Sequence, residues 1–425
     1  MNHQPSITTT QEKCIVIVDA LSTGRYLPAA FTSLGYPCVH VKNTVEHNPY
    51  FDKTFSACLF SALVDYRGDV DEVVAELLKR KIAAVVAGSE PGVELAIELG
   101  KRLGYTLTDD RVPAAVFRDK TLLYRALDYD KRLFIQEVTE NTHIDFQSLQ
   151  RRLPIVVKPV GDAGSSGVRI CEGIDEVHAA LGAIFAAPDM FNRRSARRAV
   201  LMSKVEGTEY MVNSISANGA HRVLEVWRTR KAFFNGSPAY GVADLVEQDC
   251  PSVARVKEVA VDALRRLGVL NSAAHIEIIA PGDDREPIVI DFGLHLQGLV
   301  DPSLALAVYG TTPVLESALA AVNPRAYAAR PLPKHMARCR SITLHAPRDG
   351  ILAENVRWEL LESLPGVHSV RKAALQPGAR VSRTKDGLSS FGTVYLVGDE
   401  VQIERATEAV RGIERHSVFY DCSTA

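Results

Sequence analysis

Cysteine is scarce in this chain, and its seven cysteines are scattered. No two of them form a CxxC pair, so their spacing predicts neither a disulfide framework nor a zinc site and favours reduced thiols. No apolar run approaches the length of a membrane-spanning helix, and the N-terminal stretch MNHQPSITTTQEK lacks the apolar segment of a signal peptide. These absences favour a cytoplasmic protein without a membrane partner, and we predict that residues 1–13 form a disordered lead-in.

The chain also lacks a strong charge of either sign. It has 49 basic and 51 acidic residues and a formal net charge of −2, so no electrostatic argument favours nucleic acid as a partner. The most basic short stretch, residues 193–198, is predicted to be a solvated face. A length of 425 residues with 46% hydrophobic and 24% charged residues predicts a soluble globular protein of two to four domains.

Two common phosphate-binding motifs are missing. There is no GxxxxGK[ST] loop, and no GxGxxG opens a helix after a first strand. Residues 154–167, PIVVKPVGDAGSSG, instead predict a short strand that ends at Lys158 and continues into a Gly/Ser loop. Glycines let backbone N–H groups converge on an anion, and a lysine adds a mobile charge for phosphate. The segment indicates a nucleotide triphosphate held under a loop, unless it is only a tight surface hairpin.

Strands and helices alternate in the first part of the chain. The sequence predicts strands at 14–19, 37–42 and 83–87 and helices at 69–80 and 93–103. This alternation predicts a parallel, doubly wound sheet in a domain spanning residues 14–117, with ligands beyond the carboxyl ends of the strands. Glu90, in a loop at that edge, is a candidate substrate contact, although a surface acid near a helix N-terminus explains it equally well.

The elements after residue 117 follow a different pattern. We expect a β-rich α+β domain over 118–333, with strands at 199–202, 210–217, 222–229, 273–279 and 287–292 and a helix at 252–267. Pro331-Leu-Pro is a linker by composition. Beyond it, residues 334–425 are expected to form a small α/β unit with strands at 341–346, 367–372 and 392–397.

Two acidic residues lie on neighbouring strands of the predicted central domain. Glu277 alternates with His275 along one strand, and Asp291 ends the apolar run of the next. Carboxylates in such a position are costly unless they are paired or bind a metal ion. Two carboxylates that face one point are suitable ligands for Mg²⁺ that also holds phosphates. The alternative is that each acid simply faces solvent.

Five segments, taken in order, resemble the ATP-grasp superfamily. They are RDKTLLYRAL with Lys120, the Lys158 strand with GDAGSSG, LMSKVEGTEYMV, HIEI and IVIDFG. The resemblance covers essentially the whole chain. It implies a doubly wound pre-ATP-grasp domain, two lobes at about 118–200 and 201–333 that clasp MgATP, and a C-terminal cap.

The resemblance also implies roles for individual residues. Lys120 and Lys158 would contact the phosphates, and the loop with Gly164, Ser165 and Ser166 would close over them. Backbone groups of Ser203 and Val205 would pair with the adenine edge, Glu209 would take the ribose hydroxyls, and Glu277 and Asp291 would hold Mg²⁺. Glu209 could instead be a surface carboxylate after a turn.

Within the superfamily, the chain is most similar to the L-amino-acid ligases, which form dipeptides and related amides. The similarity is carried by VDALSTGRYLPAAF and AGSEPGVELA in the first domain, by EVWRTRK and by the C-terminal unit. It implies that Arg228 and Arg230 hold a substrate carboxylate, and Glu90 and His275 are the other candidate substrate contacts. Arg228 could equally be a surface charge on an alternating strand.

The implied reaction has two steps. A carboxylate takes the γ-phosphoryl group of ATP to give an acyl phosphate and ADP, and an amine then displaces phosphate. Small-molecule carboxylate and amine substrates are therefore the expected partners, a homodimer is an open option, and specialised-metabolite biosynthesis is the expected setting.

Two positions depart from the family pattern. The family usually has Asn two residues after the second metal-binding acid and often Arg two residues later, whereas this chain has Gly293 and His295. We therefore expect His295 or Arg228 to supply the missing positive charge, with Lys158 as the third candidate catalytic residue, or else catalysis to be weakened. His295 could also be a buried structural histidine.

Two other functions remain open at this point. Biotin-dependent ATP-grasp carboxylases have Asn-x-Arg-x-Gln-Val-Glu-His after the second acid, whereas GLHLQGLV here retains only Gln297 of the later residues. The second alternative is an ATP-binding protein with impaired catalysis, suggested by Gly293 and His295. Retention of both lysines, the loop and both acids argues against it.

Overall fold

The structure is a computed structural model. It describes residues 12–46, 52–191, 197–234, 236–283, 285–298, 300–354, 356–372, 376–387, 389–415 and 420–421. The lead-in up to residue 11 and Arg193 and Arg194 of the basic stretch lie outside the described residues.

The first domain contains the parallel sheet that the sequence predicts. Its strand order is β3-β2-β1-β4 and all three pairings are parallel. The elements are β1 (Lys13–Val18), α1 (Leu27–Ser33), β2 (Cys38–Asn43), β3 (Ala62–Tyr66), α3 (Val70–Leu77), β4 (Lys81–Ala87) and α4 (Val93–Leu103). Strand β3 was not predicted. It lies at the edge of the sheet, and its side chains alternate between half-buried and exposed positions, with Leu63 exposed.

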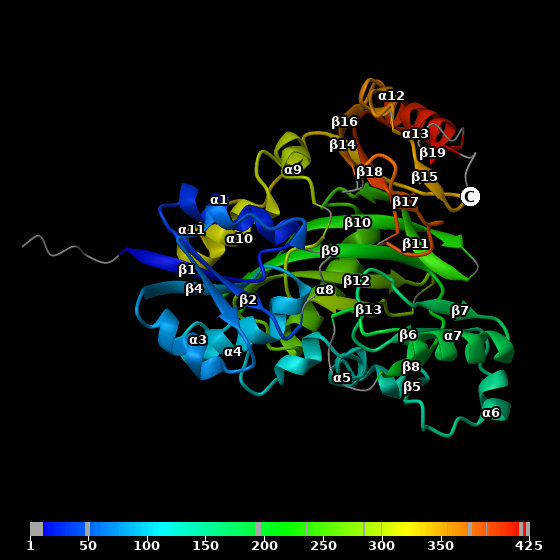
Figure 1. The fold of residues 1–425 in the computed structure, drawn as a ribbon, viewed down its shortest axis with the longest axis horizontal. Coiled ribbons are helices and arrows are strands. Elements are labelled where there is room, and N and C mark those ends of the chain that lie inside the picture. Colours follow the sequence, from blue (N-terminus) through cyan, green and yellow to red (C-terminus); the bar gives the residue numbers. More distant parts are fainter. Residues whose placement is uncertain are drawn as a thin grey trace, which may run out of the picture.

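Alternation along β1 explains why this sheet is covered on both faces. Val16 and Val18 belong to the apolar cluster that includes residues of α3 and α4. Ile15 and Ile17 point the other way and pack with α1 and with α10 (Pro313–Val322), a helix from much later in the chain. Figure 1 shows this layering, with α3 and α4 on one side of the sheet and α1, α10 and α11 (Pro324–Ala329) on the other.

A four-stranded antiparallel sheet follows, with strand order β5-β8-β6-β7. Its elements are α5 (Lys120–Ala126), β5 (Ile135–Val138), α6 (Phe146–Gln150), β6 (Ile155–Pro159), β7 (Arg169–Cys171), α7 (Ile174–Ala186) and β8 (Ala199–Ser203). Helix α7 packs its apolar residues on this sheet and buries Val177, Leu181 and Ile184. The layer positions Lys158, which lies on β6.

The largest sheet has eight strands in the order β13-β12-β9-β10-β11-β14-β18-β16. The strands are β9 (Thr208–Ala217), β10 (Ala220–Phe234), β11 (Ser237–Leu245), β12 (Ser272–Ala280), β13 (Ile288–Gly293), β14 (Arg338–Leu344), β16 (Val367–Lys372) and β18 (Gly392–Gly398). Helices α8 (Ala254–Arg266) and α13 (Glu400–Arg415) pack against it.

This sheet differs from the sequence expectation in two ways. Strand β10 is longer than predicted, and it is followed by β11, which the sequence did not indicate. The C-terminal strands β14, β18 and β16, expected in a separate small unit, extend the central sheet because β14 pairs with β11. The domain boundary at residue 334 therefore stays a prediction. Strands β11 and β14, which lie on its two sides in the sequence, are hydrogen-bonded to one another.

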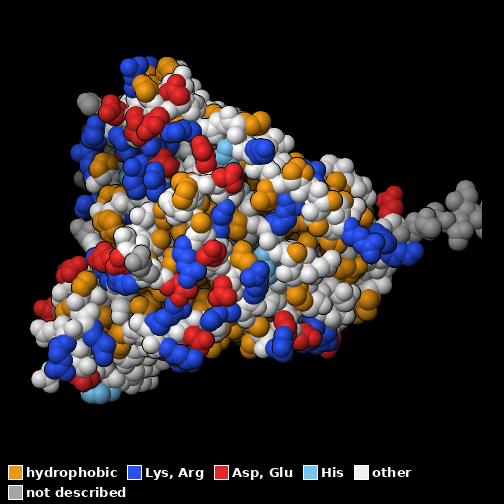
Figure 2. Space-filling model, turned by 180° about the vertical axis from the view of Figure 1, so that it is seen from behind, with side chains coloured by type: hydrophobic (Ala, Val, Ile, Leu, Met, Phe, Trp, Pro, Cys, Tyr) orange, Lys and Arg blue, Asp and Glu red, His pale blue; other side chains and the backbone are white. Residues whose placement is uncertain are grey.

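The remaining elements are short. They are α9 (Pro302–Tyr309), α12 (Glu359–Glu362), the three-stranded sheet β17 (Arg380–Val381), β15 (Gly350–Leu352) and β19 (Tyr420–Asp421), and 3₁₀ turns at Ser22–Tyr26, Ala57–Leu59, Glu90–Gly92, Ala114–Phe117, Tyr129–Lys131 and Pro251–Val253. In the described part of the chain no single helix is long and apolar enough to cross a membrane; α9 and α10 reach that length and composition only together, across an 87° bend. Acidic and basic side chains are interspersed on the face seen in Figure 2.

Candidate active site

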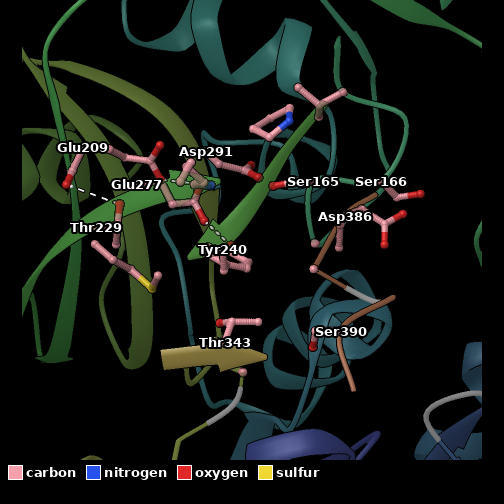
Figure 3. A pocket seen from close by; sticks show the side chains of 18 of the residues that line it. Ser165, Ser166, Glu209, Thr229, Tyr240, Glu277, Asp291, Thr343, Asp386 and Ser390 are labelled. Carbon is pink, nitrogen blue, oxygen red and sulfur yellow. Dashed lines mark hydrogen bonds and ion pairs between the residues drawn. The ribbon is translucent and has the colours of Figure 1, made fainter. Parts of the chain in front are cut away.

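A cavity of about 1130 Å³ lies between the three main layers. The first domain contributes Ser22 and Glu90 to its lining, the four-stranded sheet contributes Lys158, and the eight-stranded sheet contributes Glu277. Figure 3 shows that Ser165, Ser166, Glu209, Glu277, Asp291 and Asp386 surround one space. The chain thus brings most of the predicted site residues together from segments far apart in the sequence.

Lys120 and Lys158 enter the cavity from different elements. Asp119 caps α5 by accepting hydrogen bonds from the amides of Thr121 and Leu122 at 2.8 and 3.0 Å, which fixes Lys120 at the first turn. The Lys120 ammonium lies 3.0 Å from the Asp162 carbonyl oxygen and 3.3 Å from a carboxylate oxygen of Asp291. Lys120 is thereby held beside one of the two candidate metal ligands.

Lys158 is more deeply buried than Lys120. Its ammonium donates to the Tyr124 hydroxyl and, at 3.2 Å, to the Ile290 carbonyl. Burial and the neighbouring charge of Lys120 lower the pKa of Lys158 to about 7. An anion bound between the two ammonium groups would relieve this repulsion, so the pair is suited to phosphate.

The Gly/Ser loop has the backbone conformation of an anion-binding turn. Gly164 and Gly167 have φ of +66° and +70°, and Ser165 adopts the same left-handed region at +61°. A Cβ at Gly167 would lie 2.7 Å from Pro159 Cγ, so glycine is required there. The amide of Gly387 donates to the Gly164 carbonyl at 3.1 Å, which ties the loop to the C-terminal part of the chain.

Glu277 and Asp291 are direct cross-strand partners on β12 and β13. Such partners carry their side chains on the same face, about 5 Å apart at Cβ. The Tyr240 hydroxyl donates to Glu277 at 2.6 Å, as Figure 3 shows, and the Phe292 amide donates to Asp291 at 3.0 Å. Burial raises the pKa of Glu277, but Lys231 and Tyr240 outweigh this and lower it, so the carboxylate is ionised.

These two carboxylates fit a Mg²⁺ ion that is shared with phosphates. Among the described residues, no three His, Cys, Asp or Glu side chains converge as a metal cage. Mg²⁺ is commonly held by one or two carboxylates, with waters and substrate phosphates completing the shell. Glu277 and Asp291, with two lysines close by, provide this donor set.

Lys231, which the sequence interpretation missed, links the acids of the site. Its ammonium lies 3.0 Å from Glu209 and 3.9 Å from Glu277, and 4.2 Å above the ring centre of Tyr240. Burial raises the pKa of Glu209, and the Lys231 charge counters part of that shift. The sequence did contain a signal for Lys231, which is the last residue of EVWRTRK. Because side chains alternate along a strand, this lysine lies on the face opposite to the two arginines.

The two arginines of that segment differ in their relation to the cavity. Arg228 and Arg230 both point toward Asp244, at 3.7 and 3.1 Å, and both side chains are more than half exposed. Arg230 reaches the lining of the cavity, but Arg228 does not. Strand alternation is the reason, because Thr229 and Lys231 occupy the inward-facing positions of β10. The catalytic and substrate roles expected for Arg228 do not fit this placement.

Glu90 and His295 meet across the boundary between the first domain and the large sheet. The His295 Nε2 lies 2.7 Å from a Glu90 carboxylate oxygen, and the other oxygen lies 2.6 Å from the buried guanidinium of Arg118. Burial would raise the pKa of Glu90, but Arg118 and His295 outweigh it and hold the pKa well below its usual range. Arg118 is a second residue that sequence reasoning left without a role.

Each ring nitrogen of His295 lies next to a hydrogen-bond acceptor. Its Nδ1 lies 2.7 Å from the Leu296 carbonyl oxygen, and its Nε2 faces the ionised Glu90. Both partners accept hydrogen bonds, so the protonated ring can donate to both of them. His295 therefore lies where the family often has arginine, with an acceptor beside each ring nitrogen.

The glycine at position 293 is explained by His275. A Cβ on Gly293 would lie 2.1 Å from Cε1 of the His275 ring, so this ring fills the space of a side chain at 293. His275 also contacts His295 edge-on, with ring centres 4.8 Å apart. The two departures from the family pattern are thus neighbours in one histidine cluster.

The expected adenine contacts are only partly available. Ser203 and Val205 both line the cavity. The Ser203 amide already donates to the Phe134 carbonyl at 3.0 Å, and its hydroxyl accepts from the Phe134 amide at 3.2 Å. The Val205 amide has no hydrogen bond to any residue that the structure describes, so it is the better candidate donor of the two.

Comparison with known proteins agrees with this arrangement. The family model for the ATP-grasp domain matches residues 151–300, which include Lys158, Glu209 and both carboxylates. The chain carries an ATP-grasp domain. It is 27% identical over 413 residues to dapdiamide A synthase of Enterobacter agglomerans, which covers 95% of this chain and 96% of that protein.

Solved structures share the fold of this protein over nearly the whole chain. The L-amino acid ligase from Bacillus licheniformis superimposes with a TM-score of 0.71 at 16% identity, covering 95% of this chain and 98% of that one. The ADP-bound N5-carboxyaminoimidazole synthetase from Staphylococcus aureus gives a TM-score of 0.63 at 11% identity, covering 94% and 96%. The predicted fold class is confirmed, and the chain is similar to the L-amino-acid ligase group of the superfamily.

Proposed function

We propose that the protein is an ATP-dependent ligase that joins a small carboxylate, an amino acid, to an amine and releases ADP and phosphate. The main observation behind this proposal is the cross-strand pair Glu277 and Asp291, which lies in one cavity with Lys120 and Lys158. The similarity to dapdiamide A synthase and to an L-amino acid ligase supports amide formation as the reaction.

The nucleotide occupies the end of the cavity between the two lobes. Lys120, Lys158 and the loop at Gly164–Ser166 bind its phosphates, and Glu277 and Asp291 hold Mg²⁺. The Val205 amide and the Ser203 backbone face the adenine, and Glu209, positioned by Lys231, accepts the ribose hydroxyls. Mg²⁺ supplies charge neutralisation at the phosphoryl oxygens.

The chain's own groups act mainly by position and charge. An oxygen of the substrate carboxylate forms a bond to the γ-phosphorus while the bond to ADP breaks, giving an acyl phosphate. The amine nitrogen then forms a bond to the carbonyl carbon, phosphate leaves with the former carboxylate oxygen, and the amine loses a proton. The proposal assigns His295, which Glu90 and Arg118 hold in place, to the side of the oxygens on which negative charge develops. The closed loop limits hydrolysis of the acyl phosphate.

The histidine cluster argues against impaired catalysis. His275 fills the space of the missing side chain at position 293, and His295 occupies the position of the missing arginine. The carboxylase alternative has no such support, because GLHLQGLV lacks the Glu and His that end the carboxylase motif. Neither alternative is favoured by a feature of the site.

The proposal also covers the cellular compartment and the oligomeric state of the protein. We infer a cytoplasmic enzyme of specialised metabolism that acts on small molecules, and the free state of all cysteines in the described part of the chain supports a reducing compartment. A homodimer is also proposed, because edge strand β3 leaves Leu63 exposed. Sedimentation equilibrium tests the oligomeric state.

The deciding experiment measures ADP release with MgATP against a grid of amino acids, singly and in pairs, with mass analysis of the products. We expect ADP only with a particular pair, together with a condensed product. Hydroxylamine in place of the amine should trap the acyl phosphate as a hydroxamate. MgATP binding without turnover for any pair or with hydroxylamine would contradict the ligase assignment.

A further inference from the structure

The Gly/Ser loop of the cavity contacts a turn from the C-terminal part of the chain. The amide of Gly387, in a turn at residues 384–387, donates to the Gly164 carbonyl at 3.1 Å. Figure 3 shows Asp386 on the same side of the cavity as Ser165. The reaction proposed above assigns no role to this turn, although it holds the loop that binds the phosphates.

This hydrogen bond also orients the amide of Ser165. The Gly164 carbonyl and the Ser165 N–H belong to one planar trans peptide unit, so they point in opposite directions. The Ser165 N–H is therefore directed away from Gly387, and it has no hydrogen-bond partner among the residues that the structure describes. Ser165 lines the cavity that also contains Lys120 and Lys158. An unpaired N–H in this place is suited to a phosphate oxygen.

The turn is itself held in a fixed position. Thr384 is fully buried, its amide donates to the Ala346 carbonyl at 3.0 Å, and its hydroxyl accepts from the Ala346 amide at 2.8 Å. The Ser389 hydroxyl accepts from the Asp386 amide at 3.0 Å, and the Ser389 amide donates to the Asp386 carboxylate at 2.9 Å. These bonds anchor Gly387 to the segment that follows β14.

The start of the loop is fixed independently of this turn. Arg197 donates two hydrogen bonds to the Asp162 carboxylate, at 3.0 and 2.8 Å, and the Lys120 ammonium donates to the Asp162 carbonyl. Such a bidentate ion pair holds both its partners in one geometry. The turn therefore acts on the middle of the loop, where the Ser165 amide lies.

Gly387 also contacts the tyrosine that binds a candidate metal ligand. A Cβ on Gly387 would lie 3.0 Å from the Gly164 oxygen and 3.0 Å from Cδ2 of the Tyr240 ring. The Tyr240 hydroxyl donates to Glu277 at 2.6 Å. Glycine thus lets the turn approach the loop and the tyrosine together, and the turn joins the phosphate side of the cavity to its metal side.

We propose that Gly387 is a positioning residue for phosphate binding, because its amide holds the Gly164 carbonyl so that the Ser165 N–H donates to a phosphate oxygen of the nucleotide. The same contact keeps the loop over the acyl phosphate and limits the entry of water. This inference deepens the proposed ligase function and rests on it. Without the contact, the Gly164–Ser165 peptide can rotate and the loop can open before the amine reacts.

Two substitutions at one position separate the hydrogen bond from the packing. Gly387→Ala and Gly387→Pro both add a Cβ, but only proline removes the N–H group. We expect Gly387→Pro to weaken the binding of a non-hydrolysable MgATP analogue about 10- to 100-fold, and Gly387→Ala to weaken it less than about fivefold. Titration calorimetry measures both affinities. Equal losses in the two variants, or no loss with proline, would overturn the role of the Gly387 amide.

Gly282→Ala is the matched control for these variants. Gly282 is exposed in the turn between β12 and β13, and no described atom lies within 4 Å of an added Cβ. It should bind the analogue as the wild type does. A similar loss in Gly282→Ala and Gly387→Ala would mean that any added methyl group in a turn has this effect, which would remove the support that packing at Gly387 gives to the inference.

The ratio of ADP to amide product is the second readout. Water that reaches the acyl phosphate attacks its carbonyl carbon and releases the carboxylate, phosphate and a proton, so ATP is consumed without amide formation. The wild type should release about one ADP per amide, whereas Gly387→Pro should release more than about two. A purely structural defect lowers ADP and amide together. An unchanged ratio would therefore overturn the role of this contact in covering the acyl phosphate.

A second variant keeps the test decisive where proline prevents folding. Ser389→Ala removes the hydroxyl that holds Asp386 and leaves the Gly387 amide in place. Analogue binding should weaken about three- to tenfold, and the ratio of ADP to amide should rise. A Ser389→Ala protein with the melting temperature, affinity and ratio of the wild type would overturn the role of the turn.

The binding measurement separates this inference from the proposed function. A wild type that binds the analogue but forms no ADP, amide or hydroxamate with any substrate would contradict the ligase assignment. The order of affinities in wild type, Gly387→Ala and Gly387→Pro would still support or overturn the role of Gly387 in phosphate binding, because that measurement needs no reaction.

Discussion

The two ends of the cavity are built in different ways. The nucleotide end uses short contiguous segments, such as the strand and loop around Lys158, and two acids on one hairpin. The other end includes Arg371 of β16 and Tyr395 of β18, which line the cavity because β14 joins their strands to β11. A site formed by residues that are close in the sequence can be recognised from the sequence. A group of residues that only the order of the strands brings together cannot.

The largest expected effect concerns the nucleotide end. Asp291→Asn keeps the shape of the side chain but removes one charge from the candidate metal site. We expect the rate of ADP release, and of hydroxamate formation, to fall about 10³-fold, because the metal contributes several kcal/mol of charge stabilisation. Product formation measured over a range of Mg²⁺ concentrations checks this.

Asp283→Asn is the matched control for that variant. Asp283 lies in the turn between the same two strands, is exposed and pairs only with Arg285 among the described residues. It should keep the wild-type rate. A similar loss in both variants would mean that the β12–β13 hairpin, rather than the Asp291 carboxylate, limits the reaction.

The second effect concerns His295, at the boundary between the first domain and the large sheet. His295→Gln removes the imidazole ring that Glu90 and Leu296 hold, and we expect kcat to fall about 10²-fold. His295→Arg introduces a positive charge and should retain more activity than His295→Gln. If Arg and Gln are equally poor while both variants remain folded, a positive charge at this position does not assist the reaction.

The third effect concerns the packing of the histidine cluster. Gly293→Asn introduces a side chain where the His275 ring lies, so we expect a destabilisation of about 1–3 kcal/mol and a lower melting temperature. His275→Ala should remove most of this penalty in the double variant, since the two positions compete for the same space. Calorimetry of the four proteins measures the coupling, and strictly additive effects would show that His275 does not fill that space.

The smallest expected effect is a pH dependence of nucleotide binding. Lys158 has a pKa of about 7 in the free protein, so it loses its proton as the pH rises through 7. Bound phosphates favour the protonated form, so binding takes up a proton at higher pH. The affinity for MgATP should fall, by up to about tenfold between pH 7.5 and 8.5.

Calorimetric titration in buffers of different ionisation enthalpy would show the proton uptake directly. Lys158→Met should bind more weakly and lose this pH dependence, whereas Lys334→Met, a change in the linker region, should keep it. A pH dependence that persists in Lys158→Met belongs to another group.

Several features of the fold and site followed from sequence patterns. The parallel sheet over the first domain, the Lys158 strand and the pairing of Glu277 with Asp291 depend on periodicity and on one hairpin. In contrast, strand β11 was missed, and with it the pairing that carries β14 into the central sheet. The outward position of Arg228 was missed because alternation separates two faces of a strand without indicating which one meets the cavity.

The sequence by itself determined the local chemistry: a lysine before a glycine loop, two acids on adjacent strands, and a histidine where arginine is usual. These depend on neighbouring residues, whose geometry is fixed by covalent connection and short-range hydrogen bonds. Only the tertiary structure decided that Lys231 faces the acids, that Arg118 and Glu90 hold His295, and that Arg371 lines the cavity. Those contacts join residues from different layers, and strand order and packing decide which of them meet.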